Sequence, residues 1–207
     1  MKTEFLTKCY PNLETALIQE IEEYAILKTF DANQFVVEQG QYIKYLPIIQ
    51  SGCIKVFCNE DAISFLLYYI KSGESCIYSF AHVNNNEQAN FSAVAEMDSE
   101  LLLLPIDKVE LWIKKYPSLN SIVLNNYKKH YNDLLDTTKQ IICHDLEERL
   151  IAYLETKSKL LETDLISISH QEIADDLGTS REVISRIMKK TSLKKVVKQE
   201  GRKIKIL

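Results

Sequence analysis

The sequence predicts an α+β protein: first an antiparallel β jelly roll, then one long helix, then a helix-turn-helix that ends in a β-hairpin. Short β-rich runs alternate with turn residues through the first half of the chain. Apolar residues then recur at steps of three and four, and two helix-start signals follow on either side of a glycine. The parts expected from these observations are residues 1–116, 117–144 and 145–207.

The composition is that of an ordinary globular protein. The 207 residues are 46% hydrophobic and 26% charged, with only 5 Gly and 4 Pro. The longest uncharged apolar run, residues 101–106, is too short to span a bilayer, and residues 1–19 carry Lys and Glu where a signal peptide needs an apolar stretch. Five cysteines without disulfide-framework spacing are typical of reduced thiols. These features predict a cytoplasmic protein without membrane association.

Charge is distributed unevenly along the chain. The formal net charge is −4, but residues 179–207 contain ten basic and two acidic side chains, a net charge of +8. The remaining residues therefore carry −12. A basic end on an acidic body is typical of a module that binds a polyanion, although a basic tail is also often only a solvated surface.

The first half of the chain predicts two short helices followed by short strands. Leu13, Leu17, Ile18 and Ile21 keep the spacing of one helix face. The expected strands are residues 34–37, 45–50, 53–58, 63–70, 76–79, 91–95 and 101–105. Turn residues separate them at positions 38–40, 51–52, 71–74 and 84–86. Strands this short and regular favour an antiparallel sandwich or jelly roll.

A long helix is expected over residues 118–144, after a short helix over 107–115 that Asp107 caps and Pro117 stops. Its large side chains form a seam of Leu119, Ile122, Val123, Tyr127, Tyr131, Leu134, Leu135, Thr138, Ile141 and Ile142, with Asn126 and His130 as polar breaks. A seam kept over about three heptads predicts a homodimer. The alternative is that this helix packs on its own barrel. Residues 145–159 predict a further amphipathic helix.

Residues 169–189 predict the helix-turn-helix. Ser169 is expected to cap the first helix, with Glu172 completing a capping box. Ala174 is small where two helices must cross, and Gly178 supplies the positive φ that the turn requires. The second helix, which Ser180 caps, is expected to bury Ile184, Ile187 and Met188.

The outward face of the second helix suits the recognition of bases. Arg181 and Arg186 can each bond guanine O6 and N7, and Glu182 can accept from cytosine N4. Glu182 and Arg186 are four residues apart, so a solvated ion pair is the alternative interpretation. The hairpin that follows places Lys203 and Lys205 on one face, where they suit phosphates. Together the helix pair and the basic hairpin favour DNA binding.

These features resemble the Crp/Fnr family of bacterial transcription regulators over nearly the whole chain. The segments that carry the resemblance are SGCIKVF at residues 51–57, KSGE at 71–74 and the run from His170 to Arg186. The resemblance implies a jelly-roll domain related to cyclic-nucleotide-binding domains, a dimerisation helix and a winged helix-turn-helix. It implies a homodimeric regulator, not an enzyme, whose partners are a palindromic double-stranded operator and RNA polymerase.

The resemblance also assigns roles to single residues. Ser180, Arg181, Glu182 and Arg186 match the family's recognition motif, in which the two arginines and the glutamate contact bases. The matching phosphate contacts are Ser169, Gln171 and Ser180, to which the charge pattern adds Lys189, Lys203 and Lys205.

The sensor domain lacks the residues that bind a cyclic phosphate in nucleotide-binding members of this family. Ile77-Tyr78 and Ala89-Asn90 stand where those members carry Gly-Glu and Arg-Ser pairs. No arginine precedes Arg149, and no lysine lies between residues 71 and 108. A buried phosphate without a cation is costly, so cAMP is not expected as the ligand and the effector stays unknown.

Other cofactors and catalysis are not expected either. Cys53 and Cys58 are five residues apart on one expected strand, so their side chains should point to opposite faces. An iron–sulfur cluster needs its thiolates close together and is therefore not expected. His82 is the only histidine in the expected barrel segment, and we expect it to lie in a surface loop. A haem ligand or the metal ligand of a cupin enzyme is not expected there. No nucleophile–base pair or phosphate-binding glycine loop is present. The alternative function is a jelly-roll interaction protein whose basic end binds partners or DNA without reading sequence.

Overall fold

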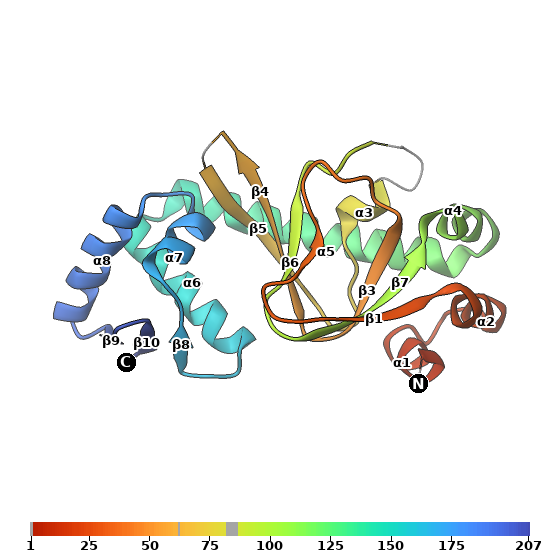
Figure 1. Ribbon diagram of the computed structural model, residues 1–207, viewed down its shortest axis with the longest axis horizontal. Coiled ribbons are helices and arrows are strands. Elements are labelled where there is room, and N and C mark those ends of the chain that lie inside the picture. The colour runs from red at the N-terminus through yellow and green to blue at the C-terminus, as the bar shows by residue number, and fades with distance from the viewer. Residues whose placement is uncertain (1, 62, 82–86) are drawn as a thin grey trace. The chain divides into compact units, whose positions relative to one another are not determined.

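The computed structural model describes residues 2–61, 63–81 and 87–207 (Figure 1). The chain divides into two compact units. The N-terminal unit consists of Met1–Cys58 with Leu67–Leu134, and the C-terminal unit of Asn59–Leu66 with Leu135–Leu207. None of the helices in the described ranges is long and apolar enough to cross a membrane.

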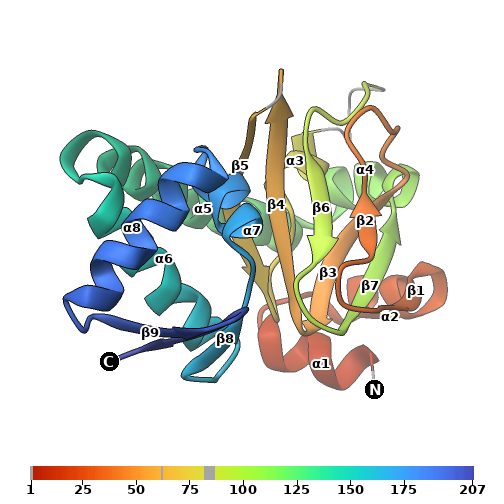
Figure 2. The same cartoon turned by 60° about the vertical axis from the view of Figure 1, so that its left-hand side comes forward.

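Two antiparallel sheets, apart from their residues 59–66, build the N-terminal unit, as the sequence predicted. One sheet has the order β1-β7-β3 and is formed by β1 (Ile26–Phe30), β7 (Ser99–Pro105) and β3 (Tyr45–Ser51). The other has the order β2-β6-β4-β5 and is formed by β2 (Phe35–Val37), β6 (Ser92–Ala95), β4 (Cys53–Glu60) and β5 (Ile63–Lys71). Figure 2 shows β2, β6 and β4 side by side in this second layer.

Strand β7 lies between two hydrophobic cores, which explains its run of four leucines. Leu102 and Leu104 face α1 (Lys2–Cys9), α2 (Thr15–Tyr24) and α4 (Ile106–Lys115), where they join a core that includes Trp112. Leu101 and Leu103 face the second sheet and its buried Phe91. Because successive side chains of a strand point to opposite faces, both cores need apolar residues from this one strand.

Several local expectations were wrong. Residues 77–79 begin the helix α3 (Ile77–Ala81), where a strand over 76–79 was expected. Cys76, just before the helix, and Phe80 are four residues apart and both buried, which fits helical spacing. The pairing of β1 with β7 extends the sheet before residue 30, where no strand was expected. Asp107 does not cap α4, whose N-cap is Pro105. His82 and the turn at 84–86 lie outside the described residues.

Helix α5 (Pro117–Cys143) follows, and its polar breaks are buried in the N-terminal unit. The Ser75 amide donates to Asn126 Oδ1 at 3.0 Å, and His130 Nε2 lies 3.2 Å from the Ser75 carbonyl oxygen. The His130 ring stacks on Tyr68 with 4.3 Å between centroids. Burial lowers the pKa of His130. Asn126 and His130 therefore hold α5 against its own unit.

The C-terminal unit packs three helices on a small sheet. The elements are α6 (Leu146–Leu160), β8 (Leu165–Ser167), α7 (His170–Leu177), α8 (Arg181–Leu193), β9 (Val197–Glu200) and β10 (Lys203–Ile206), with sheet order β8-β10-β9 (Figure 1). Asp145 begins α6 with a capping box to Glu148. The expected hairpin is confirmed, and β8 is a third strand that the sequence did not predict.

Candidate nucleic-acid interface

The first helix of the helix-turn-helix begins and ends as the sequence predicted. The Glu172 amide donates to Ser169 Oγ at 3.1 Å, and the Ser169 amide donates to Glu172 Oε2 at 2.8 Å. Gly178 ends α7 with φ 65° and ψ 46°, in the left-handed region. The Thr179 amide then bonds the Ala174 carbonyl at 2.9 Å, which completes a Schellman turn. This turn sets the direction in which α8 leaves α7.

The second helix packs its apolar face on the first. Ile184 and Met188 are buried against Ile173 and Ala174, all at 1% exposure or less. The Ser180 hydroxyl accepts from the Val183 amide at 3.4 Å and so caps α8. Packing on one side leaves the opposite side of α8 to solvent.

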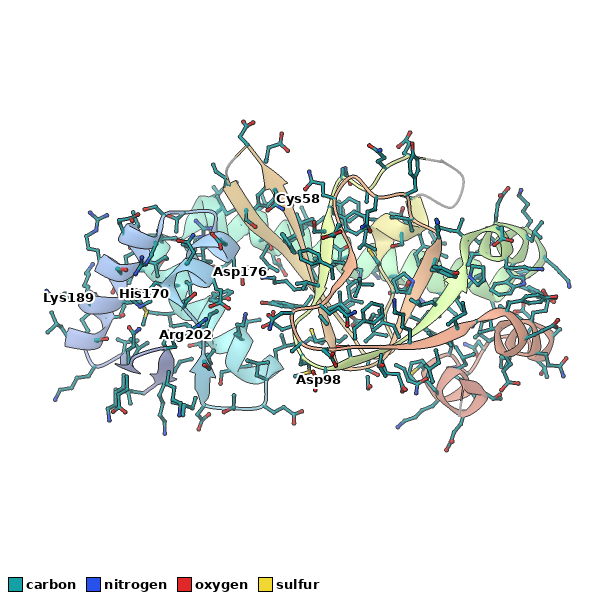
Figure 3. All side chains as sticks on the ribbon, in the orientation of Figure 1. Cys58, Asp98, His170, Asp176, Lys189 and Arg202 are labelled. Carbon is teal, nitrogen blue, oxygen red and sulfur yellow. The ribbon has the colours of Figure 1, made fainter. Side chains whose placement is uncertain are left out.

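That opposite side carries the expected base-reading residues. Arg181, Glu182, Arg186 and Lys189 are all exposed, and Figure 3 shows Lys189 on the outer side of α8. Among the described residues, Glu182 and Arg186 form no ion pair with each other. The alternative interpretation of these two residues, a solvated ion pair, is therefore not observed. Hydrogen bonds from its own backbone amide and from Ser180 lower the pKa of Glu182, which keeps its carboxylate ionised as an acceptor.

A cavity of about 490 Å³ opens between the start of α7, the start of α8 and the β9–β10 hairpin. The predicted residues Ser169, Gln171 and Arg181 line it together. Its wall also contains His170 and Arg202, which the sequence pattern did not single out (Figure 3). Backbone amides at a helix start, combined with arginines, can bind an anionic group such as a phosphate.

His170 joins three elements around this cavity. Its Nδ1 lies 2.8 Å from Ser185 Oγ on α8, and its Nε2 lies 3.0 Å from Gln199 Oε1 on β9. Gln199 Nε2 donates to the Gly201 carbonyl at 2.8 Å, so Gln199 Oε1 is an acceptor and His170 Nε2 is the donor. The ring therefore holds the hairpin against α8. Spacing alone could not reveal this, because the partners are 15 and 29 residues away.

The hairpin has the alternation that the sequence predicted. Ile204 is fully buried, while Lys203 and Lys205 on either side are exposed. Arg202 Nη2 lies 2.8 Å from Glu172 Oε2. Burial of Glu172 opposes its ionisation, but hydrogen bonds from Ser169 and Arg202 outweigh this and lower the pKa of Glu172.

Not all of the basic residues near the C-terminus belong to this face. Lys190 Nζ and Lys194 Nζ each lie 2.6 Å from a carboxylate oxygen of Glu147. These pairs connect α8 to the start of α6. The charge count of the segment therefore overstates the charge available to a polyanion.

The predicted seam of α5 separates into covered and exposed residues. Leu119 is buried in the core of its own unit, and Ile122, Val123 and Leu134 pack partly buried against that unit's cores. The other predicted positions are exposed or partly exposed: Tyr127, Tyr131, Leu135, Thr138, Ile141 and Ile142. Leu124, which the predicted seam did not include, is 68% exposed and extends this stripe. Leu119 is therefore not available to a partner chain.

Two of the positions that the resemblance associates with a cyclic phosphate, Tyr78 and Ala89, pack against neighbouring residues. Tyr78 stacks on Phe91 at 5.0 Å and faces Tyr68 at 6.3 Å, and Ala89 is only 2% exposed. In the described ranges, no three His, Cys, Asp or Glu side chains gather as metal ligands. Cys53 is buried and Cys58 half-buried.

Comparison with known proteins assigns both parts of the chain. A model of the cyclic nucleotide-binding domain matches residues 27–116, and a model of the Crp-like helix-turn-helix domain matches residues 148–207. The global nitrogen regulator of Nostoc sp. is 21% identical over 189 residues, covering 87% of this chain and 85% of that protein. The regulator of the same name from Synechocystis sp. is 22% identical over 172 residues, covering 79% of this chain and 76% of that protein.

Solved structures show the same fold. A Crp/Fnr regulator of Eubacterium rectale matches with a TM-score of 0.87 at 22% identity, covering 96% of this chain and 92% of that one. The c-di-GMP responsive regulator CLP of Xanthomonas campestris matches with a TM-score of 0.81 at 17% identity, covering 93% and 99%. The cyclic nucleotide-binding model and the Crp-like helix-turn-helix model together span most of the sequence, and the chain belongs to the Crp/Fnr family of transcription regulators.

Proposed function

We propose that this protein is a cytoplasmic, homodimeric regulator that reads a palindromic DNA operator and acts on RNA polymerase. Residues 1–116 serve as the sensor, 117–144 as the dimerisation helix and 145–207 as the DNA-binding domain. The observation that carries the proposal is the solvent-facing side of α8, where Arg181, Glu182 and Arg186 lie exposed beside a basic hairpin. Reading requires free donors and acceptors on a helix that fits the major groove.

Each group of residues has a role in this proposal. Arg181 and Arg186 bond guanine O6 and N7, and the ionised Glu182 accepts from cytosine N4. The phosphate contacts come from Ser169, Gln171, Ser180, Lys189, Lys203 and Lys205. The capped start of α7 presents backbone amides beside Ser169 and Gln171, and a helix start favours an anion there. Phosphate contacts set the position of the domain, and α8 supplies the sequence preference.

Dimerisation is proposed along the exposed stripe of α5. The stripe consists of Leu124, Tyr127, Tyr131, Leu135, Thr138 and Ile142, spaced by three or four residues. A double variant Tyr131→Asp with Leu135→Asp should sediment as a monomer, because it places two carboxylates in the apolar contact of each chain. Asn132→Asp, an exposed change on the same helix, should stay dimeric. A dimeric double variant at micromolar concentration would place the interface elsewhere.

The sensor is proposed to respond to something other than a cyclic nucleotide. Stacked rings of Tyr68, Tyr78 and Phe91 occupy the relevant region, and the sequence supplies no lysine or arginine between residues 71 and 108 to hold a phosphate there. Millimolar cAMP should therefore leave the melting temperature unchanged. Binding at 100 times the dissociation constant would stabilise the protein by about 2.7 kcal/mol, which a thermal scan detects easily. A saturable upward shift would contradict this assignment.

His170 is proposed to align the hairpin with the recognition helix. His170→Ala removes both bonds, to Ser185 and to Gln199, so the hairpin lysines should contact phosphates less often. We expect affinity for any duplex to fall about tenfold and the salt dependence to become shallower, by roughly one unit for each phosphate that the hairpin no longer neutralises. His170→Gln, which can still donate to Gln199, should recover part of the affinity. An unchanged salt slope in His170→Ala would show that the ring has no such role.

A further inference from the structure

A groove of about 590 Å³ lies in the N-terminal unit, and the stacked rings of the sensor are not part of its lining. Residues of β1, β2, β3 and β7 and of the connection before β3 line it. A volume of this size is typical of small-molecule sites, which often lie at the mouths of barrels.

The floor of the groove is a continuation of the sandwich core. On β1, Ile26, Lys28 and Phe30 share one face, and Phe30 belongs to the core between the sheets. Leu103 of β7 pairs with Ile26 and belongs to the same core. Yet Ile26 is 47% exposed, and Tyr45, on the matching face of β3, is 37% exposed. The core-facing surface therefore extends beyond the part that the other sheet covers.

The opposite wall is fixed by backbone hydrogen bonds. Tyr42 lines the groove from the connection between β2 and β3 and is 54% exposed. Two backbone hydrogen bonds just before Tyr42 pair this segment with Ala89. The Gly40 amide donates to the Ala89 carbonyl at 2.7 Å, and the Ala89 amide donates to the Gln41 carbonyl at 2.8 Å. The groove thus has two defined apolar walls rather than a collapsed gap.

The charged side chains of the groove are all positive. Lys28 stands at a core-facing position of β1, with Nζ 4.7 Å from the centre of the Phe30 ring, and Lys44 lies in the same lining. No carboxylate is among the lining residues of this part of the described chain. By contrast, Lys115 and Lys129 of the same unit each pair with a glutamate. Lys28 and Lys44 are both exposed, and lysines beside apolar surface with no carboxylate in the lining can pair with an anion.

We propose that this groove binds a small organic carboxylate with an extended apolar or aromatic body. The body completes the core over Ile26, Tyr45 and Leu103, where apolar surface is removed from water. The carboxylate pairs with the ammonium groups of Lys28 and Lys44.

Decanoate and its uncharged counterpart 1-decanol test the proposal on the full-length protein. Isothermal titration should give saturable decanoate binding, and 1-decanol should bind about tenfold more weakly because it lacks the charge. Lys28→Met keeps the apolar stem but removes the charge, and should weaken decanoate about tenfold while leaving 1-decanol unchanged. Lys55→Met is the matched control, since Lys55 Nζ also lies over a phenylalanine ring, at 5.3 Å from the centre of Phe57, but outside the groove.

A second variant covers the case in which Lys28→Met folds poorly. Tyr45→Ala removes a partly exposed side chain that lines the groove, and it should weaken the binding of both decanoate and 1-decanol. Inward-pointing lysines on edge strands also guard against strand pairing, and that role alone would leave decanoate unbound. The absence of saturable decanoate binding to the wild-type protein overturns the proposal, as do equal effects of Lys28→Met and Lys55→Met.

Discussion

Asp176→Ala is expected to lower the free energy of unfolding of the C-terminal unit by about 3–5 kcal/mol, because it removes one side of a buried ion pair. The Tyr153 hydroxyl donates to Asp176 Oδ2 at 2.6 Å. Lys157 Nζ lies 3.8 Å from the same oxygen and donates to the Tyr153 hydroxyl at 3.2 Å. Asp176 is 6% and Lys157 7% exposed. Without Asp176, the buried ammonium loses its nearby counter-charge.

The neighbouring residue supplies a control for this prediction. Asp175 accepts a hydrogen bond from the exposed Gln171 side chain, so Asp175→Ala should change stability by no more than about 0.5 kcal/mol. Replacing both charges, as in Lys157→Met with Asp176→Leu, should restore most of the stability. Urea unfolding followed by circular dichroism measures all three variants. Equal stability of Asp175→Ala and Asp176→Ala would mean that the buried pair contributes nothing.

Arg181→Ala is expected to cost about 1–3 kcal/mol of operator affinity per half-site and to relax preference at one base pair. Arg181 lies at the first position of α8, exposed, and at the mouth of the cavity that the hairpin also lines. In the proposed function its exposed guanidinium bonds a guanine edge with two hydrogen bonds, which alanine cannot replace. Binding to a scrambled duplex should change much less.

Lys203→Ala is the matched change on the hairpin. Lys203 is exposed on β10 and suits a phosphate, which every sequence provides. It should weaken operator and scrambled duplexes equally and make the salt slope shallower by roughly one unit. Titrations of both duplexes at several salt concentrations separate the two variants. A selective loss of operator binding in Lys203→Ala would move the reading surface to the hairpin.

The helix-turn-helix could be predicted almost residue by residue because its signals are local. The cap at Ser169, the left-handed turn at Gly178 and the inner face at Ile184 depend on neighbours within one turn or one crossing. The same is true of the alternation around Ile204. Where local chemistry fixes the backbone, sequence and structure agree.

Contacts between distant segments could not be predicted in this way. Periodicity places Leu119 and Tyr131 on one seam of α5, but the barrel covers the first and leaves the second exposed. It likewise marks Asn126 and His130 as breaks in a contact, although they hold the Ser75 backbone 51 and 55 residues away. Glu147, which pairs with Lys190 and Lys194, stands far from them in the sequence. These contacts depend on how segments far apart in the sequence pack together, which the local sequence pattern does not specify.

Selection of bound sequences from a pool of random DNA duplexes tests most directly whether the protein recognises a DNA sequence or binds any duplex through its charge. The selected duplex and a scrambled one are then titrated at one salt concentration. We predict a palindromic selected sequence that wild-type protein binds about a thousandfold or more tightly than the scrambled one, with half-sites one helical turn, about 34 Å, apart. Equal affinity for both duplexes would contradict sequence reading and would identify the basic C-terminal end as a non-specific binding surface.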